Sequence, residues 1–301
     1  MFAHSTSLII PTKDRYNYLI RFFKSLDKYV KEFNEIIIID SSKESEFKKI
    51  KNKFNNFNNI RIIKSKPSIS IQRNIGIKNF NKKNKFIMFC DDDILFKKNT
   101  MENMNKFIIK NPKIIGYGFN LIRKEKHGLI EKLKRSKIFK NFGLYHYNSG
   151  KVCHNGWHTK IENIKKDTYV EWLSTQACIY KSKLLKNKSL FDTSLGNYSY
   201  LEDLFLSFEL SKAGKLKVCH TSKYLHPNDI DRNNFKFGMQ EIKNRYKFVK
   251  NNNLNVYKFY LTTLIKLLYT FALIVSLRLN KIPKFLGNCY EVILCLTRLQ
   301  K

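Results

Sequence analysis

The sequence predicts an α/β protein with a Rossmann-like, doubly wound and mostly parallel sheet, followed by a C-terminal helical extension. In the first third of the chain, apolar runs of strand length alternate with segments of helical periodicity. This β-α-β-α-β order is typical of a parallel sheet with right-handed crossovers. The run 36–39 is wholly apolar, as expected for a strand covered on both faces. After about residue 230 the chain becomes basic and apolar, so we expect two parts, residues 1–230 and 231–301.

Composition narrows the class of protein. The 301 residues carry 57 Lys and Arg against 24 Asp and Glu, a formal net charge of +33, which favours nucleic acid, anionic lipid or a phosphorylated substrate as partner. The chain is also rich in Lys, Asn and Ile, as AT-rich codons would make it, so the rarer acidic residues are more informative. Six cysteines without a CxxC pair favour reduced thiols in a cytosolic protein. The first expected strand begins close to residue 1, so we expect no secretory signal.

The hydrophobic pattern gives the expected elements in order. Strands are expected at 7–11, 35–40, 60–63, 86–90 and 114–119, helices at 18–30, 45–54 and 100–109, and a loop that opens a helix at 68–77. Between residues 123 and 167 the pattern supports no assignment. The histidines of that segment, His146, His154 and His158, have no Cys or acid spaced to complete a zinc site, so we expect them at the surface or on the acceptor side.

Acidic residues follow three of the expected strands. Asp14 follows the first strand, Asp40 ends the second, and Asp91-Asp92-Asp93 ends the strand 86–90. Ligands of open α/β sheets bind at this carboxyl edge, and no GxGxxG follows the first strand, so a dinucleotide site is not expected. Adjacent carboxylates repel one another unless a cation joins them, and oxygen ligands favour Mg²⁺ or Mn²⁺. A solvated acidic turn explains the cluster equally well when the cluster is considered alone.

A second acidic pair stands at the start of an expected helix. Leu201, Leu204, Phe205 and Phe208 have helical spacing and predict one buried face, and Gly214 is placed to end the helix. Glu202 and Asp203 then fall in the first turn, where the helix dipole favours ionised carboxylates. Simple stabilisation of the helix N-terminus is an alternative to a catalytic role.

The tail combines apolar and basic residues. We expect a basic helix at 235–249, followed by an apolar segment at 254–279 whose uncharged run, 267–277, covers 11 residues. A bilayer span needs roughly 20 residues, so a transmembrane helix is the least favoured interpretation. The basic residues that flank or interrupt the run are Lys258, Lys266, Arg278, Lys281 and Lys284. Two interpretations remain open. The segment is an amphipathic element that lies in an anionic membrane surface, or it is one that packs on residues 1–230.

Together these motifs resemble glycosyltransferase family 2, the inverting enzymes of the GT-A fold, over about residues 5–228. Four segments carry the resemblance: Leu8–Arg15, Ile37–Ser42, Phe89–Asp93 as the DxD motif, and Leu201–Asp203 as the ED motif. Arg73-Asn74 with Gly76 is similar to the segment that precedes the DxD strand. Three departures occur: Asp14 stands where Asn is frequent, Ser41-Ser42 replaces an acid and Gly, and the loop before Phe191-Asp192 lacks a Gly-Asn start.

The resemblance implies transfer of a sugar from a nucleotide-diphospho-sugar to a hydroxyl acceptor by single displacement. It implies donor-nucleotide contacts from Pro11, Thr12, Asp14, Asp40, Arg73, Asp91 and Asp92. It also implies that Asp93 and Asp91, with His226 as a further ligand, hold Mg²⁺ or Mn²⁺ against the leaving diphosphate. Asp203 would be the general base, with Glu202 beside it in the catalytic pair.

Two other functions stay open at this point: a basic nucleic-acid-binding protein and a sugar nucleotidyltransferase. The Lys residues are spread along the whole chain and the acidic clusters would repel phosphate, so we expect no nucleic-acid partner. The expected acceptor is a glycan or a lipid-linked glycan in cell-surface polysaccharide or glycolipid biosynthesis. The expected location is the cytoplasm, with peripheral attachment to the cytoplasmic face of the membrane if the tail binds lipid.

Overall fold

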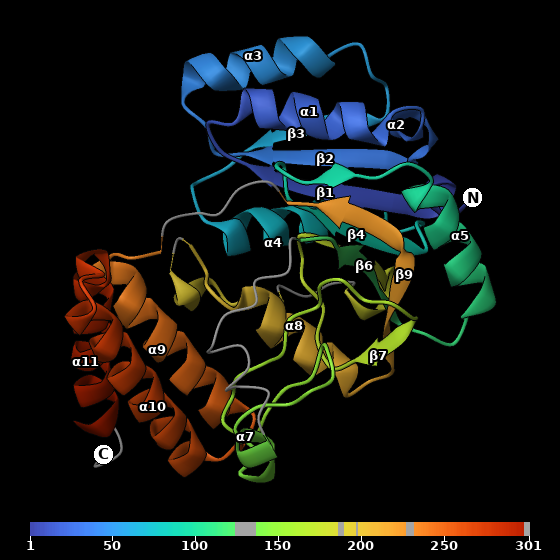
Figure 1. Ribbon diagram of the computed structural model, residues 1–301. Coiled ribbons are helices and arrows are strands. Elements are labelled where there is room, and N and C mark those ends of the chain that lie inside the picture. The colour runs from blue at the N-terminus through green and yellow to red at the C-terminus, as the bar shows by residue number, and fades with distance from the viewer. Residues whose placement is uncertain (124–136, 186–189, 197, 227–231, 298–301) are drawn as a thin grey trace. The chain divides into compact units, whose positions relative to one another are not determined.

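The structure, a computed structural model, describes residues 1–123, 137–185, 190–196, 198–226 and 232–297 (Figure 1). Contacts divide the chain into two compact units. We call residues 1–124 and 160–228 the sheet unit, and residues 125–159 and 229–301 the helical unit. The described residues of the helical unit are 137–159 and 232–297.

The sheet unit is built on a nine-stranded sheet with the order β3-β2-β1-β4-β8-β6-β9-β5, and β7 pairs with β9. Its strands are β1 (Thr6–Thr12), β2 (Glu35–Asp40), β3 (Ile60–Lys64), β4 (Phe86–Cys90), β5 (Leu95–Phe96), β6 (Gly116–Leu121), β7 (Thr168–Val170), β8 (Ala177–Lys181) and β9 (Leu216–Leu225). The predicted parallel arrangement is confirmed for β1 to β4. β8 runs antiparallel to both β4 and β6, so the complete sheet is mixed.

Helices cover both faces of this sheet (Figure 1). The helices of the sheet unit are α1 (Tyr16–Leu26), α2 (Tyr29–Glu32), α3 (Glu44–Phe54), α4 (Ile69–Asn79), α5 (Thr100–Lys110) and α8 (Glu202–Ser211). Successive side chains of a strand point to opposite faces. Leu8 and Ile10 of β1 accordingly join the core cluster that contains Leu19 of α1, whereas Ile9 meets Gly76 of α4. The apolar residues 36–39 of β2 are fully buried, as predicted, and its acidic ends, Glu35 and Asp40, are buried too.

The helix expected at 18–30 is two helices, because Asp27 has a left-handed backbone with φ 52°. Left-handed residues end helices, and α1 closes where the Asp27 N–H donates to the carbonyl of Phe23 at 3.2 Å. The chain then restarts as the single turn of α2.

The buried face predicted for the helix after Leu201 is only partly correct. Leu204 is buried, but Phe205 and Phe208 are half-exposed, and Leu206 and Leu210 are buried instead. The single-face pattern failed because α8 is enclosed on more than one side. Gly214 does not form a left-handed helix end either; a side chain there would collide with Ile115.

Strand register brings the acidic strand ends together. In the parallel pairing of β1 with β2, Thr12 lies opposite Asp40, and in that of β1 with β4, Ile9 lies opposite Phe89. The strand ends at Thr12, Asp40 and Cys90 therefore meet at one edge of the sheet. The Asp91 N–H continues the pairing with the next strand by donating to the carbonyl of Gln176 at 3.1 Å.

The helical unit contains α7 (Lys137–Asn141), α9 (Phe235–Asn251), α10 (Val256–Val275) and α11 (Ile282–Thr297). α9 and α11 approach at backbone distance, because side chains added at Gly238 or Gly287 would collide with main-chain atoms of the opposite helix. An apolar cluster, composed of Ile242, Tyr246, Val249, Phe259 and Cys295, joins the three long helices. Of the histidines expected at the surface or on the acceptor side, His154 is exposed and His158 is half-buried. Burial and the charge of Arg245 lower the pKa of His158 to about 3.

α10 lies within the apolar segment expected at 254–279 and is longer than the uncharged run 267–277. Its 20 residues are, in the described part of the chain, long and apolar enough to cross a membrane by length and composition, and 11% of its most apolar stretch is buried. The uncharged run stops at Lys266, in the middle of the helix. In the structure Lys266 turns inward to an ion pair with Glu241 at 2.5 Å.

We predict that Gly287→Ala destabilises the chain by about 1–3 kcal/mol, because the new methyl group is forced against the main chain of Phe235. Helix propensity alone would give the opposite sign. The measurement is the urea midpoint followed by far-UV circular dichroism. Lys243→Ala, at an exposed position of α9, is the control and should change the midpoint little; an unchanged midpoint for Gly287→Ala would refute the close approach.

Candidate active site

The loops after β1 and β2 are tied to each other at the first corner of the site. Asp14 takes a left-handed backbone with φ 52°, so that its N–H donates to Ser42 Oγ at 2.6 Å while its Oδ1 accepts from the Lys43 N–H at 2.9 Å. Asp40 is fully buried and its Oδ1 accepts from the Ser42 N–H at 2.7 Å. Asp40 Oδ2 is also buried and has no hydrogen-bond partner among the described residues. Burial raises the pKa of Asp40, although the hydrogen bonds from Ser42 act in the opposite direction.

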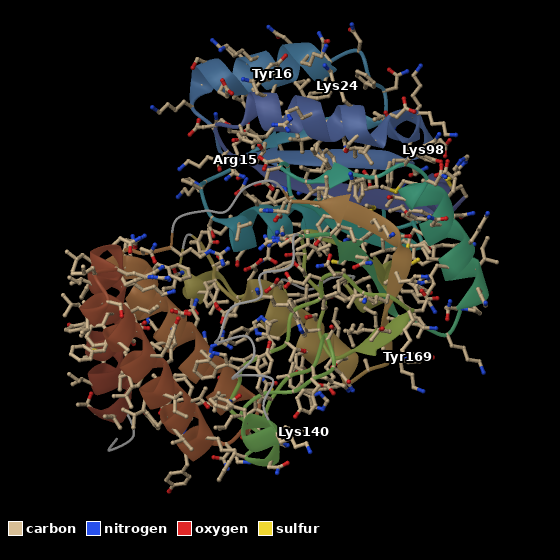
Figure 2. The ribbon with its side chains drawn as sticks, in the orientation of Figure 1. Arg15, Tyr16, Lys24, Lys98, Lys140 and Tyr169 are labelled. Atoms are coloured by element: carbon tan, nitrogen blue, oxygen red, sulfur yellow. The ribbon has the colours of Figure 1, made fainter. Side chains whose placement is uncertain are left out.

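Asp92 faces inward, where it is held by two side chains from the first loop. The Thr12 hydroxyl donates to Asp92 Oδ2 at 2.5 Å, and the Arg15 guanidinium donates to Asp92 Oδ1 at 3.1 Å. Arg15 precedes α1 at the strand ends, as Figure 2 shows, and it also donates to Asp93 Oδ2 at 2.8 Å. Burial raises the pKa of Asp92 to about 7, while the positive charge of Arg15 opposes that rise. Asp92 therefore anchors the loop to the strand end.

Asp91, Asp93 and His226 form a cluster suited to a cation. One potential ligand atom of each lies within 4.8 Å of the others. Asp93 Oδ1 is buried, faces His226 Nε2 at 3.2 Å, and has no hydrogen bond of good geometry. Burial favours a raised pKa for Asp93, but the nearby His226 and the charge of Arg15 hold its pKa below the ordinary value. Two carboxylates and an imidazole around an unsatisfied buried oxygen fit a divalent cation.

Arg73 links this cluster to α8. It is 1% exposed, its Nη2 donates to Asp91 Oδ1 at 2.7 Å, and its Nη1 donates to Glu202 Oε1. The Thr175 hydroxyl also donates to Glu202 Oε1, at 3.3 Å. Burial raises the pKa of Glu202, with repulsion from the neighbouring carboxylates, while Arg73 opposes the rise. The guanidinium thus joins the end of β4 to the first turn of α8.

The segment that carries Arg73 is fixed on both sides. The Asn74 side chain donates to the carbonyl of Phe191 at 2.8 Å and accepts from the Phe191 N–H at 3.1 Å. The Phe191 ring lies 5.5 Å from the Arg73 guanidinium carbon, within the range of a cation–π contact. Ser68 caps the N-terminus of α4. The Arg73 side chain is therefore held before any ligand arrives.

Asp203 lies beside Glu202 in the first turn of α8, as predicted. Leu201, which precedes the helix, is left-handed with φ 76°, and Asp203 Oδ1 accepts from the Leu204 N–H at 2.8 Å. Asp203 is half-buried. Burial raises its pKa, and the charge of Arg73 acts in the opposite direction. A carboxylate with a raised pKa next to the cation cluster can accept a proton from a bound hydroxyl.

The structure brings most of the predicted site residues together. Arg73 contacts Asp91 and Glu202, and His226 closes on Asp93. Pro11 is buried within β1, where it lies opposite Ile39 of β2. Asp14 is exposed on the first loop.

Two residues without a predicted role support this edge. Arg15 bridges Asp92 and Asp93; it stands in the first motif, so its position was available from the sequence. The buried Gln72 side chain donates to the carbonyls of Thr12 at 2.8 Å and Ile39 at 2.7 Å. No sequence signal identifies a buried amide that satisfies two main-chain carbonyls of different strands.

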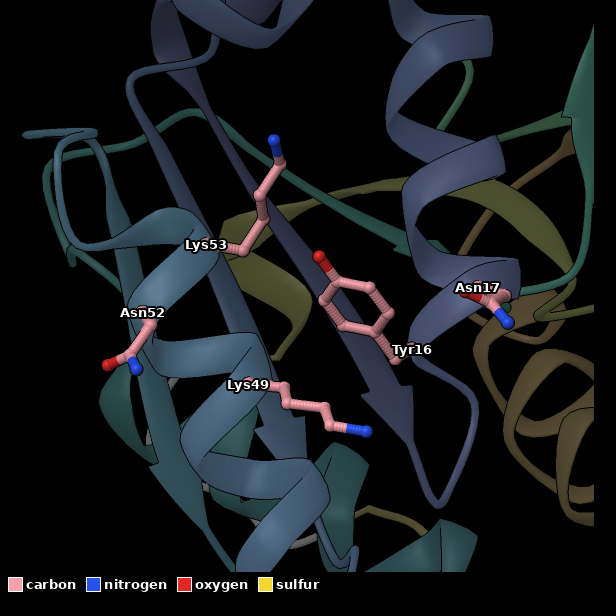
Figure 3. A pocket seen from close by; sticks show the side chains of 5 residues that line it. All are labelled: Tyr16, Asn17, Lys49, Asn52 and Lys53. Carbon is pink, nitrogen blue, oxygen red and sulfur yellow. The ribbon is translucent and has the colours of Figure 1, made fainter.

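A separate hollow of about 570 Å³ lies between α1 and α3. It is open to solvent and is lined by Tyr16, Asn17, Lys49, Asn52 and Lys53, with the Tyr16 ring directed toward α3 (Figure 3). None of the carboxylates of the strand edge lines it. The candidate active site at the carboxyl edge of the sheet is therefore separate from this hollow.

Several solved structures share this fold, which is of the GT-A type. The chain matches S. aureus TarS 1-349 with a TM-score of 0.52 at 17% identity, over 85% of this chain and 70% of that chain. TarS in complex with UDP-GlcNAc matches with a TM-score of 0.53 at 17% identity, over 84% and 69% of the two chains. GalNAc-T7 with UDP, GalNAc and Mn²⁺ matches with a TM-score of 0.51 at 13% identity, over 74% and 44%.

The family is shown by the sequence match. The family model described as Glycosyl transferase family 2 matches residues 7–167, more than half of the chain, and the protein belongs to this family of enzymes. It is also 26% identical over 208 residues to the minor teichoic acid biosynthesis protein GgaA of Bacillus subtilis strain 168. That match covers 64% of this chain and 46% of GgaA, so the chain spans about half of the relative's length.

Removing Arg73 alone should be far more harmful than removing it with its partner. We predict that Arg73→Leu lowers the free energy of unfolding by about 3–5 kcal/mol, because Glu202 and Asp91 lose their buried counter-charge. Glu202→Leu added to Arg73→Leu should recover part of this loss. The measurement is a double-mutant cycle in urea; additive effects of the two substitutions would show that the pair is not coupled.

Proposed function

We propose that this glycosyltransferase moves a sugar from a nucleotide-diphospho-sugar to a hydroxyl acceptor by a single displacement, with inversion at the sugar carbon. The observation that carries the proposal is the buried Arg73, which holds Asp91 at the end of β4 and Glu202 in the turn that presents Asp203. Arg73 would thereby fix the position of both the donor-binding strand end and the base. A retaining double displacement would need a nucleophile on the opposite face of the sugar, and the described residues around Arg73 offer no separate candidate.

The donor nucleotide would bind along the ends of β1, β2 and β4. Asp40 Oδ2, buried and without a partner, is an acceptor suited to an N–H of the base. Pro11 and Thr12 would shape this pocket at the end of β1, while Asp14 and Asp92 would complete the ribose side with Asp91. Arg73 would lie close to the diphosphate. The UDP named with two of the similar structures supports a uridine diphosphate sugar as the donor.

The cation would be Mg²⁺ or Mn²⁺, held by Asp93 and Asp91 with His226. Such a cation neutralises charge that develops on the leaving diphosphate. Asp203 would accept the proton of the acceptor hydroxyl, since its raised pKa brings its basicity closer to the working pH. Glu202, engaged with Arg73 and Thr175, would position the turn.

The acceptor class follows from charge and from the named relative. A net charge of +33 favours a phosphate-bearing acceptor, and the relative GgaA is named for minor teichoic acid biosynthesis. We therefore propose a glycan or lipid-linked acceptor of cell-surface polymer synthesis, with no nucleic-acid partner. The six cysteines are free thiols, which supports a location in the reducing cytoplasm. The anionic membrane surface would then be the cytoplasmic face of the membrane.

Asp203→Asn should lower the transfer rate by about 10²–10⁴-fold, because the amide cannot accept the acceptor proton. It should leave donor binding close to that of the wild type, since the amide oxygen can still accept from the Leu204 N–H. The measurement is turnover over a panel of nucleotide sugars together with calorimetric binding of UDP. Glu209→Gln on the exposed side of α8 is the control; normal turnover by Asp203→Asn would remove the base assignment.

The cation assignment predicts that a chelator abolishes transfer and that added Mn²⁺ restores it. Asp93→Asn should weaken Mn²⁺ binding, measured by electron paramagnetic resonance of the free ion, by at least about tenfold, because it removes the charge of a buried ligand. Asp167→Asn, at an exposed carboxylate paired with His220, is the matched control. Equal Mn²⁺ binding by the two variants would exclude Asp93 as a ligand.

A further inference from the structure

An exposed apolar stripe runs along α10. The exposed apolar residues Tyr257, Leu261, Leu264, Leu268, Phe271 and Val275 follow one another at alternating intervals of four and three residues. This spacing places them on one face of a helix. Leu277 and Leu279 continue the exposed apolar surface beyond the end of α10.

A second stripe lies on α11. Leu286, Tyr290, Ile293 and Leu296 are exposed at helical spacing, and the rings of Phe271 and Phe285 lie 6.1 Å apart, so the two helices are neighbours. Figure 1 shows them side by side in the helical unit. We call this surface the α10–α11 face. A contiguous apolar surface on two helices marks an interaction site.

Lysines of α10 and α11 are engaged with a buried carboxylate of α9. Lys266, the one charged residue in the middle of α10, turns inward to Glu241 at 2.5 Å, and Lys284 reaches the same carboxylate at 3.1 Å. Burial alone would raise the pKa of Glu241, but the charges of Lys266 and Lys284 outweigh this effect and lower its pKa to about 2. A helix with its charged side chain inside and its leucines outside is adapted to apolar surroundings.

The charged residues of these helices are mostly basic. Residues 232–297 contain eleven Lys and Arg but two acids, Glu241 and Glu291, and both acids are turned inward. Lys258 stands in the first turn of α10, and Arg278 follows its end. Two copies of this unit placed face to face would bring like charges together, whereas an anionic lipid surface would attract each of them.

We propose that the α10–α11 face docks the helical unit on an anionic lipid bilayer, with its apolar stripes in the boundary between headgroups and acyl chains. Lys258 and Arg278, at the two ends of the α10 stripe, would contact headgroup phosphates. The helix lies in the interface and does not cross the bilayer, because Lys266 is committed to Glu241 inside the unit. This docking does not depend on the sugar-transfer chemistry, and it would place the enzyme where lipid-linked acceptors reside.

The test is co-sedimentation of the full chain with vesicles, without donor. The wild type should bind vesicles of phosphatidylglycerol and phosphatidylcholine, less so at high salt, and bind pure phosphatidylcholine weakly. Leu264→Asp combined with Leu268→Asp should reduce binding by at least about tenfold. Ile109→Asp, at a 69% exposed apolar position of α5 in the sheet unit, is the matched control and should bind as the wild type does.

Circular dichroism confirms that each variant is folded, and Leu261→Gln with Phe271→Gln serves as a second, uncharged pair. Equal vesicle binding by the wild type and by both paired variants would overturn the proposal. The proposal would also be overturned if the wild type did not bind anionic vesicles but formed a dimer that the paired variants do not form. The face would then join two copies of the chain. UDP binding, measured separately, reports on the donor site alone, so loss of the docking face and failure of the proposed chemistry are distinguishable.

Discussion

The ion pairs of the buried Arg73 are the interaction on which the candidate site depends. The guanidinium holds Asp91 at the end of β4 and Glu202 at the start of α8, although these carboxylates are separated by more than a hundred residues of sequence. Because Arg73 is 1% exposed, neither carboxylate can be released to water without leaving a charge unpaired. The donor edge and the proposed base therefore share one fixed support.

This support also sets the proton affinities around it. Asp91, Glu202 and Asp203 surround a single positive charge, so burial and mutual repulsion raise the pKa of Glu202 and Asp203. Asp93, by contrast, faces His226 and Arg15, which keep its pKa below the ordinary value. The site thus separates a carboxylate that stays ionised, as the proposed cation ligand must, from one that can take up a proton.

Much of this arrangement could be predicted from sequence. The strands that end in Thr12, Asp40 and Cys90 were visible as apolar runs, and the acids beside them follow from the chemistry of a sheet edge. Contacts between distant segments could not be derived from local patterns: the role of Gln72 depends on two strands at once. The inward turn of Lys266 toward Glu241 is likewise a contact between distant segments, because the sequence shows only a charge within an apolar stretch.

Asp203 is the proposed general base, and its pKa is raised by burial. The most direct test of this assignment is the pH dependence of kcat. A base must lose its proton to act, so kcat should rise with pH through the pKa of Asp203 in the bound enzyme. We predict a midpoint clearly above the ordinary carboxyl value of 3.8, within the range where circular dichroism shows a folded chain, and the same midpoint in Glu209→Gln. A kcat that stays constant down to that ordinary value would contradict the assignment.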